Sequence, residues 1–241
     1  NSGMILTTGP IQQSTGDCAG FPSAGLGGPG DPQLSAVVAA NNDCAGTTAT
    51  FDRAVLEFVF TPTIDTVSFR YFFASTEFTS YTCSQFNDVF GFFISGPNPQ
   101  GGNYNNLNIA LIPGTNTPVA INSVHDGSGT ASTCFPCPPR NVQFYNNNEA
   151  QFGCNFPQFP WDGFTKVLTA RAAVVPCSTY FIRLAIADVG DGVLDSAVFL
   201  EANSFNSGSP SATVTDGQGF ATVGQSATYE SCDQDVAFII R

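Results

Sequence analysis

Three aspartates at the end of an apolar segment form the densest acidic cluster in the sequence. Asp188, Asp191 and Asp195 follow the segment Tyr180–Ala187, and two glycines among them keep the turn open. Calcium binds about six to eight oxygen ligands on a flexible turn, and a turn rich in Asp and Gly offers carboxylates together with free carbonyls. This cluster therefore indicates a calcium site.

Two further acids can complete such a shell. Glu77 and Asp88 lie near another predicted strand end, and they join the cluster if the two strand ends meet. The spacing is not that of an EF-hand, whose acids alternate ahead of a fixed glycine. The alternative is a turn in which the Asp side chains accept hydrogen bonds from the nearby backbone. Both interpretations stay open, and calcium is the one candidate cofactor.

Catalytic patterns are weak in this sequence. A glycosidase needs two acids across a cleft, and nothing in the sequence identifies such a pair. The single histidine, His125, lies in a loop of Gly and Ser without a nucleophile elbow or triad order, which predicts a solvated side chain. Neither GxGxxG nor a P-loop occurs. We therefore expect no enzymatic activity and no organic cofactor.

Eight cysteines favour disulfides over a metal. A zinc site needs two CxxC pairs or His partners, whereas the chain has one CxxC and one His. An even number of cysteines predicts a disulfide framework and an oxidising, extracellular compartment, although the sequence does not reveal the pairing. We expect all of them to be oxidised: Cys18, Cys44, Cys83, Cys134, Cys137, Cys154, Cys177 and Cys232.

The composition excludes two classes of partner. Nineteen acids against seven bases give a net charge of -12, whereas nucleic-acid binding needs clustered Lys and Arg. The chain has no run of eighteen apolar residues, so we expect no membrane insertion. A hydrophobic content of 42% is enough for a large core.

Apolar residues that alternate with a period of two predict strands along most of the chain. Leu56–Phe60 and Val67–Phe73 are joined by a link of hairpin length, so we expect them to pair. Asp31 as N-cap and Pro32 at the first helical position predict one helix, which ends near Ala40. The other expected strands are Val89–Ser95, Asn108–Pro113, Val119–Val124, Lys166–Val175, Tyr180–Ala187 and Ala197–Ser204.

These elements predict an all-β fold, an antiparallel β-sandwich of jelly-roll type with one short helix and long disulfide-stapled loops. Residues 125–163 form the longest loop and carry three cysteines. Its aromatic side chains stack on a glycan, bury against a partner or cover the sandwich end as a small core. They are Phe135, Phe144, Phe152, Phe156, Phe159 and Trp161.

A change in composition predicts two parts. Ser, Gly, Pro and Thr dominate after Phe205, which is typical of a linker. We expect residues 1–207 to form the sandwich domain and residues 208–241 to form a linker with strands of a following module or an inter-subunit tail. The expected strands of this second part are Gly219–Val223 and Val236–Ile240.

Six ordered blocks between residues 30 and 205 resemble the choice-of-anchor L domain of secreted surface proteins of Bacteroidota. At the position of Thr76 and Glu77 the family usually has two consecutive acids, so only the second acid is kept here. The blocks are AVLEFVF (54–60), SFRYFFASTEF (68–78), SQFNDVFGFFISGP (84–97), NIALIPGTNTPVAINSV (108–124), DGFTKVLTA (162–170) and IADVGDGVLDSAVFLEANSF (186–205).

This resemblance implies a function outside catalysis. It implies export by type IX secretion and display on the outer cell surface, within a large repeat protein of the adhesin type. Neighbouring modules, identical subunits, surface glycans or a prey or host cell surface are the implied partners. The alternative function is a subunit of a self-assembling extracellular filament or sheath, because a terminal apolar strand can complete the sheet of the next subunit.

Overall fold

The computed structural model describes residues 2–41, 44, 46–208 and 238–239. Strands dominate these residues, with one α-helix and four short 3-10 helices. The strands are β1 (Gly3–Thr7), β2 (Thr50–Phe60), β3 (Thr66–Ser75), β4 (Val89–Pro97), β5 (Asn103–Asn108), β6 (Tyr145–Asn147), β7 (Gly163–Thr165), β8 (Leu168–Ala173), β9 (Tyr180–Val189), β10 (Ser196–Glu201) and β11 (Phe238–Ile239). The helices are α1 (Pro32–Ala40), η1 (Ile11–Ser14), η2 (Ile121–Ser123), η3 (Val142–Phe144) and η4 (Ala150–Phe152).

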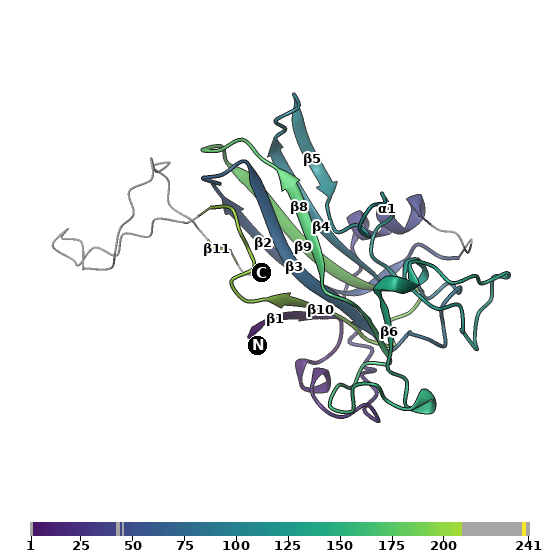
Figure 1. Ribbon diagram of the computed structural model, residues 1–241. Coiled ribbons are helices and arrows are strands. Elements are labelled where there is room, and N and C mark those ends of the chain that lie inside the picture. Colours follow the sequence, from purple (N-terminus) through teal and green to yellow (C-terminus); the bar gives the residue numbers. More distant parts are fainter. Residues whose placement is uncertain (1, 42–43, 45, 209–237, 240–241) are drawn as a thin grey trace.

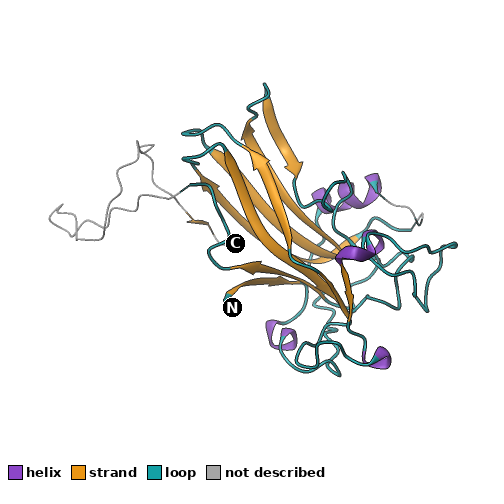
Figure 2. Cartoon of the chain, viewed as in Figure 1, coloured by secondary structure: helices purple, strands orange, loops and turns teal. Residues whose placement is uncertain are grey.

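The strands form two antiparallel sheets that face each other (Figure 1). Sheet A has the order β1-β10-β3-β7-β6, with β8 also beside β3, and sheet B has the order β11-β2-β9-β4-β5. Figure 2 shows the strands in the middle of the molecule, with the helices and long loops gathered at one end. The prediction of an antiparallel β-sandwich with one α-helix is therefore confirmed.

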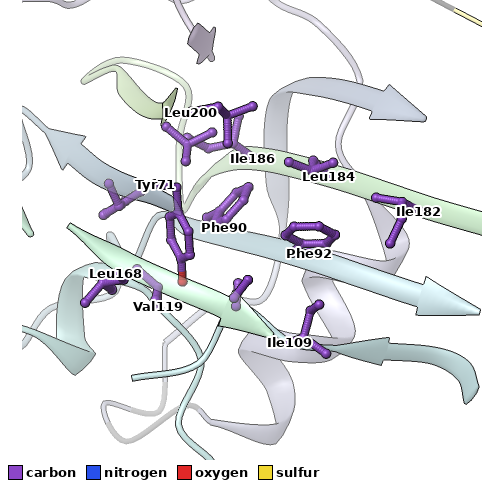
Figure 3. Close-up of a cluster of buried hydrophobic side chains, with 14 of the residues drawn as sticks. Tyr71, Phe90, Phe92, Ile109, Val119, Leu168, Ile182, Leu184, Ile186 and Leu200 are labelled. Atoms are coloured by element: carbon purple, nitrogen blue, oxygen red, sulfur yellow. The ribbon is translucent and has the colours of Figure 1, made fainter. Parts of the chain in front are cut away.

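The core lies between the two sheets and follows from the period-two pattern. Tyr71 and Phe73 of β3 point inward from sheet A, and Phe90 and Phe92 of β4 point inward from sheet B. The ring centroids of Tyr71 and Phe90 lie 5.1 Å apart across the interface. Figure 3 shows these two rings next to each other. Each of the three buried phenylalanines contributes roughly 1.5–3 kcal/mol through the area that it removes from water.

The predicted hairpin between residues 56–60 and 67–73 is wrong. β2 pairs with β9 and β11 in sheet B, whereas β3 pairs with β10, β7 and β8 in sheet A. The link at residues 61–65 therefore crosses from one sheet to the other. The length of this link fits either a hairpin or a crossing between sheets. The apolar faces of β2 and β3 therefore pack against each other across the core, and the two strands are not neighbours in one sheet.

Two predicted strands, Asn108–Pro113 and Val119–Val124, are also wrong. Residues 121–123 form η2, and β4 pairs with β9 on one side and on the other with β5, which ends at residue 108. The apolar side chains of the two segments belong to the core all the same. Their backbone groups form isolated bonds with each other and with β4: Val119 N–H donates to Ala110 O, and Phe90 N–H donates to Val119 O, each over 3.2 Å. These segments are buried without a continuous ladder of hydrogen bonds, and their apolar sequence pattern is the same as that of a strand.

The end of the chain adds a short strand to sheet B. Phe238 and Ile239 form β11, which pairs antiparallel with Phe58 and Glu57 of β2. The other expected strand of the tail, Gly219–Val223, lies outside the described residues. No helix in the described ranges is long and apolar enough to cross a membrane.

The helix α1 covers the outer face of sheet B, as its start signal predicted. The Asp31 side chain accepts hydrogen bonds from Gln33 N–H and Leu34 N–H over 3.0 and 2.9 Å and so caps the helix. Leu34 is completely buried against sheet B. Asp31 also pairs with Arg183 of β9, which contacts Glu57 of β2 over 3.2 Å. One carboxylate thus both starts the helix and fixes it to the sheet.

We expect Asp31→Ala to lower the free energy of unfolding by about 3 kcal/mol, because it removes the cap and leaves Arg183 with fewer acidic partners. Asp31→Asn should cost less, since asparagine also caps helices. Urea unfolding of both variants measures the difference. A loss below about 1 kcal/mol for Asp31→Ala would contradict this account of the helix.

Candidate functional site

The predicted metal ligands lie on two connections at one end of the sandwich. Glu77 and Asp88 belong to the connection from β3 to β4, and Asp188, Asp191 and Asp195 lie at the end of β9 and in its connection to β10. Each connection crosses from one sheet to the other. The long loops gather at this same end, near β6 (Figure 1).

Asp88 joins the two sheets at this end. Its Oδ1 accepts a hydrogen bond from Val189 N–H at the end of β9 over 2.8 Å. Its Oδ2 accepts one from the Ser196 hydroxyl at the start of β10 over 2.6 Å. Because β9 belongs to sheet B and β10 to sheet A, one fully buried carboxylate holds both strand ends.

Asp188 and Glu77 are buried without compensating partners. The side chains are 1% and 3% exposed, and neither oxygen of Asp188 nor Oε2 of Glu77 accepts a hydrogen bond. The hydroxyl of Thr8 lies near Asp188, but it is directed to the backbone of Ser196, to which it both donates and accepts. Buried carboxylates are normally paired, protonated or bound to a metal.

Burial and mutual repulsion raise the pKa of three of these carboxyls. Burial raises the pKa of Asp188, and the neighbouring Asp88 raises it further. Burial also raises the pKa of Glu77, with added repulsion from Asp88 and Asp191. For Asp88 burial again raises the pKa, although the hydrogen bonds from Ser196 and Val189 and the contact with the Asp188 carboxyl oppose this shift. The group therefore holds protons or requires a cation at neutral pH.

Asp195 has a different role, which the sequence did not indicate. Its Oδ1 accepts a hydrogen bond from Ala24 N–H over 3.0 Å, so it anchors the N-terminal segment 22–28 across this end. Asp52 does the same with Leu26 N–H over 2.9 Å and with Gly28 N–H. Asp52 lies in a bulge of β2 with φ 49°. No sequence signal marks it, because its partners lie 24 and 26 residues away along the chain.

Asp191 lies at the rim of the cluster. Its Oδ1 accepts a hydrogen bond from Val193 N–H over 3.1 Å, which is the Asp turn that the alternative interpretation expected. The structure thus brings Asp88 next to Asp188, places Glu77 and Asp191 around them and assigns Asp195 to the N-terminal segment.

Three disulfides brace the loops around this end. They join Cys18 to Cys154, Cys44 to Cys134 and Cys83 to Cys137. Each of them ties the loop 125–163 to an earlier part of the chain. The disulfide framework is confirmed for these six cysteines, Cys177 is also disulfide-bonded, and no described cysteine is free. Cys232 lies outside the described residues.

The prediction of a solvated His125 is wrong. The side chain is fully buried, its Nε2 lies 3.8 Å from Cys83 Sγ, and its Nδ1 accepts a hydrogen bond from Gly127 N–H over 3.2 Å. Cys83, His125 and Cys137 are the one set of three metal-type side chains with donor atoms within 4.8 Å of one another in the described residues. Because the two cysteines form a disulfide, this set is not a zinc site.

The aromatic residues of the loop 125–163 cover the outer face of sheet A. Trp161 is buried there against Phe199 of β10, and Phe159 packs on Phe72 of β3. Phe156 is 46% exposed and Phe135 is 77% exposed. The small-core interpretation therefore describes Trp161 and Phe159, whereas Phe156 and Phe135 are partly open to solvent.

A groove of about 570 Å³ lies beside this aromatic cover. A second hollow of about 410 Å³ shares Phe72 with it and extends along β1 and β10. Asn155 and Gln158 add side-chain amides to the apolar rings. The groove is lined by Phe72, Asn155, Phe156, Pro157, Gln158, Phe159 and Phe164.

A second acidic pair holds the base of the loop. Glu149 Oε1 accepts hydrogen bonds from Thr79 N–H and Ser80 N–H over 2.8 and 3.1 Å. Burial raises the pKa of the nearby Asp162 to about 7, and the negative charge of Glu149 adds to the shift. Asp162 thus weakens the folded state when it ionises.

We expect the stability of the protein to fall as Asp162 ionises. Its pKa is higher in the folded chain than in the unfolded chain, where it is about 3.9, so the folded state binds more protons between these values. The stability present at low pH is therefore lost as the pH rises through about 7. The free energy of unfolding of Asp162→Asn should exceed that of the wild type at pH 8 by roughly 1–3 kcal/mol, and the two should be equal near pH 4. The exposed Asp65→Asn is the control, and urea unfolding at both pH values decides.

The fold and the cysteines define a class of protein, a disulfide-braced β-sandwich domain of an oxidising compartment. The chain belongs to the choice-of-anchor L family, because the profile of the Choice-of-anchor L domain matches residues 1–206. This membership makes it a module of a cell-surface or extracellular protein. No curated protein and no solved structure shows a significant match to the chain.

Proposed function

We propose that the domain is a non-enzymatic module of a large secreted surface protein and serves attachment at the outer cell surface. Its family membership supports a surface location. The observation that carries the attachment role is the aromatic groove on sheet A, because Phe156 is exposed beside two side-chain amides. Type IX secretion and a repeat architecture belong to the same proposal.

The ligand class that suits this groove is a surface glycan of a prey or host cell. Sugar rings stack on aromatic side chains through their apolar faces, and their hydroxyl groups bond to amides such as those of Asn155 and Gln158. Phe156 contacts Phe164 edge to face, with ring centroids 4.8 Å apart, so it is held in place without a ligand. A ring that is fixed in advance loses little freedom on binding.

The buried acids give no support to catalysis. Glu77, Asp88 and Asp188 do not line either hollow on sheet A. A hydrolase needs its acid and base within reach of the substrate. The carboxyls with the most strongly raised pKa values are instead buried among the loops at the end of the sandwich.

We expect Phe156→Ala to weaken glycan binding about tenfold, since one stacked aromatic contact is worth roughly 0.5–1.5 kcal/mol beyond its buried area. The full chain and the variant are compared on a glycan array and then by titration with the glycan that binds best. Leu107→Ala is the matched control, because Leu107 is an exposed apolar residue on β5 of the other sheet. Equal binding by wild type and Phe156→Ala would contradict the groove as the attachment surface.

One observation favours the second candidate function, a filament or sheath subunit. β11 adds to the edge of sheet B beside β2 with two paired residues, and a short terminal strand of this kind can pair equally with the same edge of another copy. A neighbouring subunit would then replace the intramolecular strand.

If the filament function holds, the full chain should form oligomers that grow with concentration. Light scattering after size exclusion and negative-stain electron microscopy, from about 1 to 100 µM, measure this growth; strand exchange depends on concentration by mass action. A single monomer peak throughout, without fibres, contradicts the filament function and leaves the attachment proposal intact.

A further inference from the structure

Three buried carboxylates lie between the two crossing connections without a base to neutralise them. In the described ranges no ion pair involves Glu77, Asp88 or Asp188, and Arg70 and Arg183 pair with other acids. Only Asp88 has its oxygens bonded, to Val189 N–H and the Ser196 hydroxyl.

Three carboxylate oxygens in this cluster lack any hydrogen bond. They are Oδ1 and Oδ2 of Asp188 and Oε2 of Glu77. Both side chains are more than nine-tenths buried, so water does not replace the missing partners freely. A buried carboxylate left in this state destabilises the folded chain, and a bound cation offsets this destabilisation.

We propose that Asp88, Asp188 and Glu77 hold one calcium ion at this end of the sandwich. All the donors are oxygens, which suit a hard cation, and the cluster offers neither the nitrogen nor the sulfur that zinc prefers. Asp191, at the rim, completes the shell directly or through water. Asp195 uses Oδ1 to bond Ala24 N–H, whereas its buried Oδ2 accepts no hydrogen bond and is a further ligand atom.

The spacing of the carboxylates points to a weak site of the extracellular kind. The three side chains do not bring their donor atoms within 4.8 Å of one another, since the one such set in the described part of the chain is Cys83, His125 and Cys137. Calcium sites with few carboxylates are completed by carbonyls and waters, and extracellular modules bind with a Kd of about 0.1–1 mM. We expect Glu77 to move toward the close pair Asp88 and Asp188 when the ion binds.

The ion would fasten two connections that are far apart in the sequence. Glu77 and Asp88 come from the crossing between β3 and β4, and Asp188 comes from the end of β9, just before the crossing to β10. This inference is independent of the attachment proposal, because the groove on sheet A has none of these residues in its lining.

The test uses the full chain and calcium itself as the probe. Isothermal titration should give about one calcium per chain, and the melting temperature in 10 mM calcium should exceed that in EDTA by roughly 3–10 °C. Asp188→Asn should abolish this shift, and in EDTA it should melt at or above the wild type, because it removes an uncompensated charge at nearly constant size. Asp65→Asn makes the same chemical change on an exposed residue and should keep the full shift.

Two results would overturn the proposal. One is an equal melting temperature of the wild type in calcium and in EDTA, with no saturable heat of binding up to 10 mM calcium. The other is a calcium shift in Asp188→Asn as large as that of the wild type. If Asp188→Asn does not fold, Glu77→Gln takes its place with the same expected loss of the shift, and a retained shift overturns the proposal equally.

Discussion

The burial of two aromatic-rich sheet faces against each other is the constraint from which the rest of the structure follows. β2 and β3 are adjacent in the sequence and each has one apolar face, yet they lie in opposite sheets. Because consecutive strands face each other, their connections must cross the end of the sandwich. The crossings after β3 and β9 meet at the same end, and the acidic residues that they carry are crowded together as a result.

Each outer face is covered in its own way. On sheet B, α1 packs its apolar residues over β4 and β9 and is held there by the pair of Asp31 and Arg183. On sheet A, aromatic residues of the loop 125–163 take the place of a helix, and disulfides hold that loop in position. Irregular backbone can cover a sheet only where it is fixed, since otherwise the conformational entropy of a long loop opposes it.

The sequence predicted the elements with strong local signals. The cap at Asp31 and the alternation within β2 and β3 depend on neighbouring residues, so a single chain reveals them. The strands expected at 108–113 and 119–124 failed because buried loops and strands show the same apolar pattern. The position of His125 against a disulfide and the contact of Asp52 with residues 26 and 28 depend on distant segments. The sequence showed the acidic cluster. It did not show which carboxylates accept hydrogen bonds and which lack them.

The bond between Cys18 and Cys154 also sets the path of tension through the domain. The two cysteines are separated by 136 residues, so a pull at the N-terminus passes from the first sulfur to the second and bypasses everything between them. β2 to β6, with the groove residue Phe72 on β3, stay inside this closed loop. An open chain of that length would extend by roughly 450 Å. A surface protein that contains this domain can therefore carry load without lengthening there, and stretching is confined to the segments outside the loop.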